Sequence, residues 1–217
     1  MRFVRDVVAF DMDGVLVDSQ ALILESLDHA LSVIGRGPVT ESWRREVVGP
    51  PLRRMLEMVL GDSADPDEYD ACVTAYREHN DLFGPVRTPV FPGMTEVLFE
   101  LGRHVELIVV TSKREPSAEA ILSGTGLRSS FNAVFGSLSD ASPETKSVTL
   151  ARALQQFPRA RVLIGDREHD AVAAFEHCLC PIGVRWGYAR QGELENAGVA
   201  HIAANSADLL ELVLQQL

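Results

Sequence analysis

Short apolar segments of strand length recur along the chain and alternate with segments of helical periodicity. The expected strands are residues 7–10, 105–110, 133–135, 161–164 and 181–184. The helical patterns between most of them are residues 94–101, 115–123, 144–156 and 170–178. A last helix is expected to start at an N-cap, Ser206. Strands that alternate with helices are typical of a parallel sheet covered on both faces, so the pattern predicts an α/β fold.

One long stretch breaks this alternation, because no convincing strand lies between Asp18 and Thr88. Apolar residues follow helical spacing from Leu22 to Ile34, and glycines then stop the helix. Three more helical patterns follow, at residues 41–49, 50–61 and 66–83. We therefore expect residues 18–88 to form a helical insert, and residues 1–17 and 89–217 to form the α/β core.

Composition and charge narrow the possible partners. The net charge of −11 repels nucleic acid and anionic lipid, so we expect neither as a partner. The three cysteines are odd in number and form no CxxC pair, which argues against a disulfide framework or a zinc site. The first apolar run has only four residues and no stretch approaches a membrane span. We expect a soluble cytoplasmic protein, either a monomer or a homodimer, with no membrane partner.

Polar residues follow three of the expected strands, at the sheet edge where parallel α/β proteins bind ligands. Asp11 and Asp13 follow the first strand, the segment 111–113 follows the second, and Asp166 and Asp170 follow the fourth. Lys146 begins the helix before that fourth strand. Acidic groups, a hydroxyl pair and a lysine are therefore expected to converge at one edge.

Such a group of carboxylates needs a cation, because the charges otherwise repel each other. Several oxygen ligands and few nitrogens suit a hard divalent metal, for which we expect Mg²⁺. The metal would let the anionic Asp11 attack a phosphorus atom and form an aspartyl-phosphate. Alternation along an extended chain would direct Asp13 to the same side. Asp13 would then protonate the departing alkoxide and later deprotonate the attacking water.

The other polar residues receive supporting roles. Asp166 would be a metal ligand, and Asp170, four residues later, would reach the same metal or hold its waters. Thr111 and Ser112 would donate hydrogen bonds to phosphate oxygens. Lys146 would balance the charge of nucleophile and phosphate. Lys113 either points into the site and binds substrate, or is a surface lysine near a helix start.

The motifs D-x-D-G-V-L-V-D-S, V-T-S, a lysine and G-D-x-x-x-D occur in this order over residues 11–170. The chain resembles the haloacid dehalogenase-like superfamily, in particular its phosphoglycolate-phosphatase-like branch, over nearly its whole length. The resemblance implies a Rossmann-like parallel sheet with helices on both faces and an inserted all-helical cap domain. It implies Asp11 as nucleophile, Asp13 as acid and base, and Thr111 and Lys146 as phosphate ligand and charge partner. The implied Mg²⁺ ligands are the Asp11 side chain, the Asp13 carbonyl and Asp166, with Asp170 in support.

Some positions depart from that pattern or leave a choice open. Ser147 follows the lysine where many relatives have proline, and the acidic motif contains Arg167, Glu168 and His169, to which the sequence gives no role. In the insert, a stiff Gly-Pro-Pro turn precedes Arg53 and Arg54. Arg53 is the expected substrate-binding residue of this turn, with two surface arginines as the alternative.

The sequence therefore predicts a Mg²⁺-dependent phosphatase that hydrolyses a small phosphomonoester, such as phosphoglycolate or a sugar phosphate, through an aspartyl-phosphate. A phosphosugar mutase on the same scaffold is an alternative, because the insert decides whether water or substrate receives the phosphoryl group. A receiver-like phospho-acceptor domain is a further alternative, against which the length of the chain and the second aspartate stand. A dehalogenase is disfavoured, because that chemistry dispenses with Asp13 and with the metal.

Overall fold

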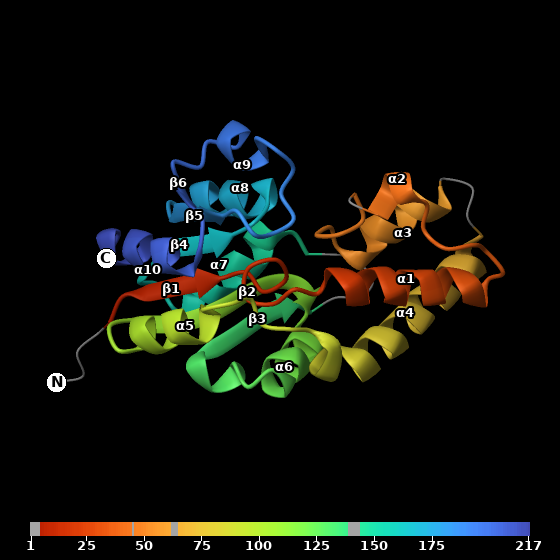
Figure 1. Ribbon diagram of the computed structural model, residues 1–217, viewed down its shortest axis with the longest axis horizontal. Coiled ribbons are helices and arrows are strands. Elements are labelled where there is room, and N and C mark those ends of the chain that lie inside the picture. Colours follow the sequence, from red (N-terminus) through yellow and green to blue (C-terminus); the bar gives the residue numbers. More distant parts are fainter. Residues whose placement is uncertain (1–4, 45, 62–64, 139–143) are drawn as a thin grey trace.

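The computed structural model describes residues 5–44, 46–61, 65–138 and 144–217. At its centre lies a sheet in the order β3-β2-β1-β4-β5-β6, in which each strand is parallel to its neighbours (Figure 1). The strands are β1 (Val7–Phe10), β2 (Glu106–Arg114), β3 (Ala133–Ser137), β4 (Ala160–Gly165), β5 (Cys180–Val184) and β6 (His201–Ala203). This order is the common Rossmann-type arrangement, so the predicted α/β fold class is confirmed.

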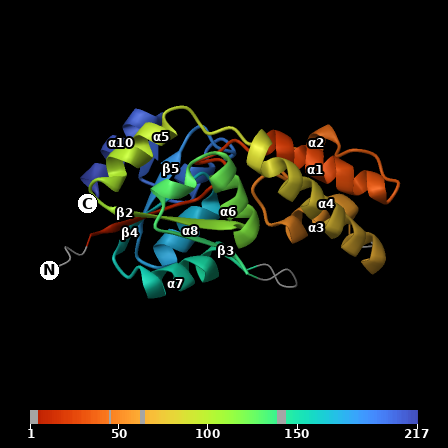
Figure 2. The ribbon, with the colours of Figure 1, turned by 90° about the horizontal axis from the view of Figure 1, so that it is seen from below.

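Helices cover both faces of the sheet (Figure 2). One face packs against α5 (Met94–Gly102), α6 (Glu115–Gly124) and α10 (Ser206–Gln215). The other face packs against α7 (Lys146–Gln156) and α8 (Glu168–Glu176). Val8 and Phe10 of β1 point to the first face, and Val7 and Ala9 point to the second. The strand is apolar without alternation because both of its faces are buried.

Beside the sheet lie the helices between β1 and α5, and in the described part of the chain all of them except α2 contribute to a second hydrophobic cluster (Figure 1). They are α1 (Gln20–Val33), α2 (Glu41–Arg44), α3 (Leu52–Leu60) and α4 (Pro66–Arg87). Their core includes Leu27 and Leu31 of α1, Leu56 of α3 and Cys72 of α4, all buried. We call α1 to α4 the helical insert; its boundaries at residues 18 and 88 stay a prediction. Among the described residues, no helix is both long and apolar enough to cross a bilayer.

The helix expected over 66–83 continues to Arg87, and other expected helix boundaries also differ from the structure. The helix expected over 41–49 ends at Arg44, and Arg45 lies outside the described residues. Val47 and Val48 are buried in an irregular segment, because Gly49 has φ 108° and the two prolines after it disfavour helix. The last helix has its N-cap at Asn205 rather than at Ser206.

The Asn205 side chain accepts hydrogen bonds from the backbone N–H groups of Ala207 and Asp208, at 2.9 and 3.0 Å. Ser206 is therefore the first residue inside the helix, and the predicted cap was one position late.

Three short elements were not predicted. They are η1 (Arg128–Ser130), α9 (Glu193–Asn196) and the edge strand β6. Each has three or four residues, too few for hydrophobic periodicity to indicate its type. The second strand also extends past Val110 to Arg114, because the backbone pairs Arg114 with Ser137 of β3 after an irregular register.

Candidate active site

The carboxyl ends of β1, β2 and β4 lie side by side and bring the predicted residues to one edge of the sheet. β1 pairs with β2 on one side and with β4 on the other, and the chain order reverses there. The backbone N–H of Asp11 donates to Ile164 of β4 at 2.8 Å. Asp11 and Asp166 therefore leave neighbouring strands at the switch point, where such sheets bind ligands.

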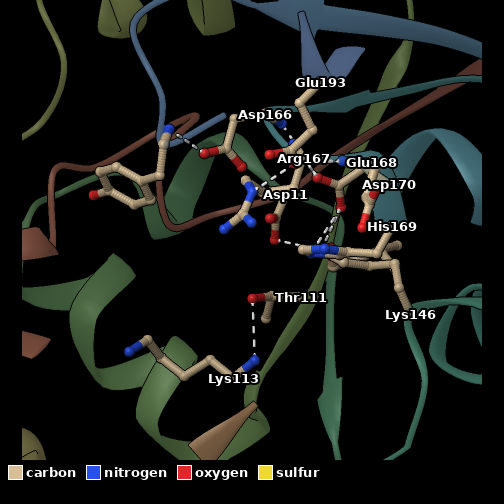
Figure 3. A network of polar contacts seen from close by, with 12 residues as sticks. Asp11, Thr111, Lys113, Lys146, Asp166, Arg167, Glu168, His169, Asp170 and Glu193 are labelled. Atoms are coloured by element: carbon tan, nitrogen blue, oxygen red, sulfur yellow. Dashed lines mark hydrogen bonds and ion pairs between the residues drawn. The ribbon is translucent and has the colours of Figure 1, made fainter. Parts of the chain in front are cut away.

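Lys146 joins two of the buried aspartates. Its Nζ lies 2.6 Å from Asp11 Oδ1 and 2.9 Å from Asp170 Oδ1, and it donates to the Val110 carbonyl at 3.2 Å (Figure 3). Thr145 caps α7 and so fixes the helix start that carries Lys146. An ammonium has three N–H donors, and Lys146 thus faces two carboxylate oxygens and one carbonyl oxygen. Lys146 is only 4% exposed, so little water screens this ion triad.

Asp170 is held at both of its oxygens. Oδ1 faces Lys146, whereas Oδ2 accepts the backbone N–H groups of Asp166 and Arg167 at 3.2 and 3.1 Å. Burial raises the pKa of Asp170, but the Lys146 ammonium and these hydrogen bonds outweigh it and hold the pKa below its ordinary value. Asp170 is therefore an anion that fixes both Lys146 and the turn after β4.

Asp166 sits in a tight cradle of backbone. Its Oδ2 accepts the backbone N–H of Tyr188 at 2.7 Å. A Cβ on Gly14 would lie 2.1 Å from this carboxylate, and one on Gly187 would lie 2.3 Å from the Asp166 side chain. Burial raises the pKa of Asp166 well above its ordinary value, and the charges of Asp170 and Asp11 raise it further. The two glycines let the chain approach this acidic group closely.

Asp11 is the third buried carboxylate. Burial raises its pKa to about 7, Lys146 opposes that rise, and Asp170 adds to it. Lys146 is paired with two of these three buried carboxylates, and such a set of oxygen donors suits a hard divalent cation. Oxygens of Asp11 and Asp170 and a ring nitrogen of His169 lie within 4.8 Å of one another, a possible metal group. Asp13 and Asp166 are not part of that group.

Asp13 faces the site from the loop after β1. Its Oδ1 accepts the Ser19 hydroxyl at 2.6 Å, and its Oδ2 lies 3.3 Å from Lys113 Nζ. The Lys113 side chain is mostly buried, so the alternative of a surface lysine does not hold. Lys113 thus reaches the same acid that the sequence predicted for proton transfer.

Thr111 and Ser112 come from the irregular end of β2. The Thr111 hydroxyl accepts the backbone N–H of Lys113 at 3.2 Å and is buried (Figure 3). Because a hydroxyl that accepts one bond keeps its O–H, Thr111 can still donate to a ligand. Both residues line the cavity described next.

A cavity of about 110 Å³ separates the sheet edge from the helical insert. We call its sheet side the core wall, formed by Asp11, Asp13, Thr111, Ser112 and Lys113. We call its other side the insert wall, formed by Ile23, Leu52, Arg53, Met55, Tyr76 and Asn80. Burial raises the pKa of Tyr76, as does the charge of Asp13, so its hydroxyl stays protonated.

Of the two arginines that the sequence left open, Arg53 lines the cavity. Its side chain is 51% exposed, and its Nε lies 3.0 Å from Glu57 Oε1. Arg54 is more exposed, pairs with the same glutamate and is not among the lining residues. The substrate-binding role of Arg53 stays a prediction.

Sequence reasoning missed a contact between the acidic motif and the insert. Arg167 is buried; its Nε donates to Glu193 at 2.7 Å and its Nη1 donates to the Val48 carbonyl at 2.7 Å. A Cβ on Gly49 would lie 2.3 Å from Nη1, so a glycine is needed at this crossing. No sequence signal could find this contact, because Arg167 is 119 residues from Val48 and 26 from Glu193.

Comparison with known proteins agrees with this geometry. A model of the haloacid dehalogenase-like hydrolases matches residues 8–178. The tyrosine-protein kinase PtkA of Mycobacterium tuberculosis is 36% identical over 211 residues, covering 94% of this chain and 70% of that protein. A 5'-nucleotidase of Pseudomonas aeruginosa is 30% identical over 211 residues, covering 95% and 94%.

The solved structures include a predicted phosphatase from Clostridium acetobutylicum, with a TM-score of 0.87 and 28% identity over 98% of this chain and 99% of that one. The predicted resemblance and the expected class of enzyme are confirmed by these relatives. The chain therefore belongs to the haloacid dehalogenase-like hydrolase family.

Proposed function

We propose that this protein is a Mg²⁺-dependent phosphatase that hydrolyses small phosphomonoesters through an aspartyl-phosphate on Asp11. One observation carries the proposal: Asp11 is buried at the switch point of the sheet, paired with Lys146, and opens onto a cavity that Thr111 also lines. Relatives named 5'-nucleotidase and phosphoglycolate phosphatase support the reaction class.

The donor set fits a divalent metal. Asp11 and Asp166 are buried acids whose pKa values are raised by burial, and Lys146 alone does not offset three carboxylates. We assign Asp11, the Asp13 carbonyl and Asp166 as the residues that would hold Mg²⁺, with Asp170 in support. When bound, the ion would offset the negative charge of the acids and of the phosphate.

In the first step, an Asp11 oxygen forms a bond to phosphorus while the bond from phosphorus to the ester oxygen breaks. Asp13 gives its proton to the departing alkoxide. Lys146 stays paired with Asp11 and Asp170 and stabilises the charge next to the nucleophile. The Thr111 hydroxyl donates a hydrogen bond to a phosphate oxygen.

In the second step, water replaces Asp11 at phosphorus. Asp13, now a carboxylate, takes a proton from that water, and the new oxygen–phosphorus bond releases Asp11 and inorganic phosphate. Ser19 and Lys113 hold Asp13 in one orientation for both transfers. Each proton given in the first step is recovered in the second, so Asp13 ends in its starting state.

We propose that the helical insert acts as a cap that excludes bulk water from Asp11. Three contacts that join it to the core support this role. Arg167 donates to Val48, Arg190 pairs with Glu46, and the Tyr188 hydroxyl accepts the backbone N–H of Ser19 at 2.9 Å. An enclosed site favours a small phosphorylated metabolite over a phosphoprotein.

A second candidate is transfer of the phosphoryl group to an acceptor other than water. The 36% identity to PtkA, a protein named as a tyrosine kinase, is the observation that favours it. The first step would be the same, and a tyrosine or sugar hydroxyl would replace water in the second. Incubation with a phosphodonor and a tyrosine peptide separates the two: free phosphate supports hydrolysis, and a phosphopeptide supports transfer.

The proposal is tested by measuring phosphate release from a panel of small phosphomonoesters, with Mg²⁺ and with EDTA. We expect turnover only with the metal, and a loss of at least about 10³-fold in Asp11→Asn. Asp18→Asn is the matched control, because Asp18 lies on the same loop but binds Gln20 and Tyr188. Full activity of Asp11→Asn would show that the assigned nucleophile is wrong.

A further inference from the structure

The insert wall contains a buried polar group that the proposed reaction does not use. Cys72, Tyr76, Asn80 and Gly84 are four residues apart on α4 and form one buried stripe of that helix. Asn80 is only 3% exposed, and its Nδ2 has no hydrogen-bond partner among the described residues. Buried amide groups are nearly always bonded, so such a group requires an explanation.

The position of Asn80 supplies that explanation. It lines the cavity beside Tyr76, with the apolar side chains of Ile23 and Met55 on the same wall. In the described part of the chain, Thr88 and Thr149 also carry buried hydroxyls without a hydrogen-bond partner, but neither lines the cavity. The next residue, Asp81, is fully engaged, by Arg114 at 2.6 Å and by Ser117 at 2.5 Å.

We propose that the Asn80 amide donates a hydrogen bond to an oxygen atom of the leaving group. This inference rests on the proposed function and names the substrate class: phosphate esters of small alcohols that carry a second oxygen, as hydroxyl, carbonyl or carboxylate. The phosphate occupies the core wall, and the second oxygen meets Asn80 across the cavity. An alkyl leaving group leaves the amide unbonded in the complex, so the site discriminates against it.

The test compares three phosphates of nearly equal size: ethyl phosphate, 2-hydroxyethyl phosphate and phosphoglycolate. The wild type is expected to favour one or both of the oxygen-bearing esters over ethyl phosphate by about 10- to 100-fold in kcat/KM. Asn80→Leu, which keeps the shape but removes the polar atoms, is expected to abolish that preference and leave kcat/KM for ethyl phosphate within about twofold. Asn80→Ala is expected to give the same kinetic pattern without requiring a leucine to fit.

Thermal unfolding provides a readout besides activity. If Nδ2 is unbonded without substrate, Asn80→Leu raises Tm by roughly 2–4 °C. Thr88→Val is the matched control. Like Asn80→Leu, it removes a buried polar group that has no hydrogen-bond partner among the described residues, but Thr88 does not line the cavity. Both variants are expected to be more stable than the wild type, and only Asn80→Leu changes the choice of substrate.

Two results would overturn the inference. One is an equal loss of activity on all three esters in Asn80→Leu and Asn80→Ala, which would make Asn80 a structural residue. The other is a wild type that hydrolyses ethyl phosphate as well as the oxygen-bearing esters. If the wild type hydrolyses none of the three esters with Mg²⁺, the proposed function is wrong, and the inference about Asn80 is then wrong as well because it depends on that function.

Discussion

The two walls of the cavity differ in how their polar side chains are paired. On the core wall, Asp11 is paired with Lys146, Asp13 with Ser19 and Lys113, and the Thr111 hydroxyl with a backbone N–H. The insert wall combines the apolar side chains of Ile23, Leu52 and Met55 with Arg53, Tyr76 and the Asn80 amide, whose nitrogen has no hydrogen-bond partner among the described residues.

This difference between the walls indicates which side chains must be held rigidly for the proposed reaction. A reacting acid must be held in one geometry. The ends of the strands and the first turns of the helices that pack on the sheet hold the core-wall residues in place. Under the proposed function, Asn80 on a helix outside the sheet gains a hydrogen-bond partner only when the substrate binds. The following predictions test each wall in turn.

After Asp11→Asn, the largest effect is expected for Asp13→Asn on the core wall. An amide cannot donate and then recover the proton, so turnover should fall by roughly 10²- to 10⁴-fold. With an activated ester, whose leaving group needs no acid, phosphorylated Asp11 should accumulate and be detectable by mass spectrometry. If turnover persists and no adduct forms, Asp13 is not the acid and base.

A somewhat smaller loss is expected for Lys146→Met. Removing the ammonium leaves Asp11 and Asp170 as buried anions without their partner, which costs about 3–5 kcal/mol in the free energy of unfolding. We expect kcat to fall about 10²-fold or more. Denaturant unfolding in EDTA and steady-state kinetics in Mg²⁺ measure the two effects. Unchanged stability would mean that the ion triad does not form in solution.

The contact between the α/β core and the segment that carries the insert is tested by Arg167→Met. The loss of a buried charged hydrogen bond to Val48 should lower kcat/KM about tenfold. Arg190→Met is the matched control: it also removes a contact with the insert, but the Arg190 side chain is 63% exposed, so a change of less than about twofold is expected. Equal changes in kcat/KM for the two variants would mean that the contact from Arg167 matters no more than the exposed contact from Arg190.

Because Asp11 on the core wall is buried, the free energy of unfolding should depend on pH when EDTA keeps the site free of metal. The pKa of Asp11 is about 7 in the folded protein against an ordinary 3.8, so the folded state holds a proton that the unfolded chain has lost between these values. This group's contribution is therefore present below pH 4 and is lost as the pH rises through 7.

Thermal unfolding of the wild type and Asp11→Asn measures that contribution. We expect the variant to gain stability relative to the wild type from pH 5 to pH 8, and Mg²⁺ to stabilise the wild type more at pH 8. A constant difference between the two proteins would contradict the raised pKa.

The smallest effect is expected for Arg53→Ala on the insert wall. The Arg53 side chain is half exposed and already paired with Glu57, so solvent screening and the glutamate weaken its electrostatic attraction for a substrate anion. KM for phosphoglycolate should rise about two- to fivefold with kcat unchanged. A much larger rise in KM would make Arg53, rather than Asn80, the main contact to the leaving group.

Apart from the edge strand β6, the sequence by itself determined the strands of the sheet, the main helices that cover it and the residues of the core wall. Strand ends in a parallel sheet meet at one edge, so Asp11, Thr111 and Asp166 could be placed together from their order alone. Short elements such as β6 and α9 escaped, because three or four residues show no periodicity.

Only the tertiary structure decided what faces the core wall. Asn80 lies in an ordinary helical pattern, and Arg167 stands in a motif where its contact to Val48, 119 residues away, left no local trace. Local pattern records the period of an element and the side it buries. It does not record which distant element covers that side, because that depends on how the helical insert packs against the sheet.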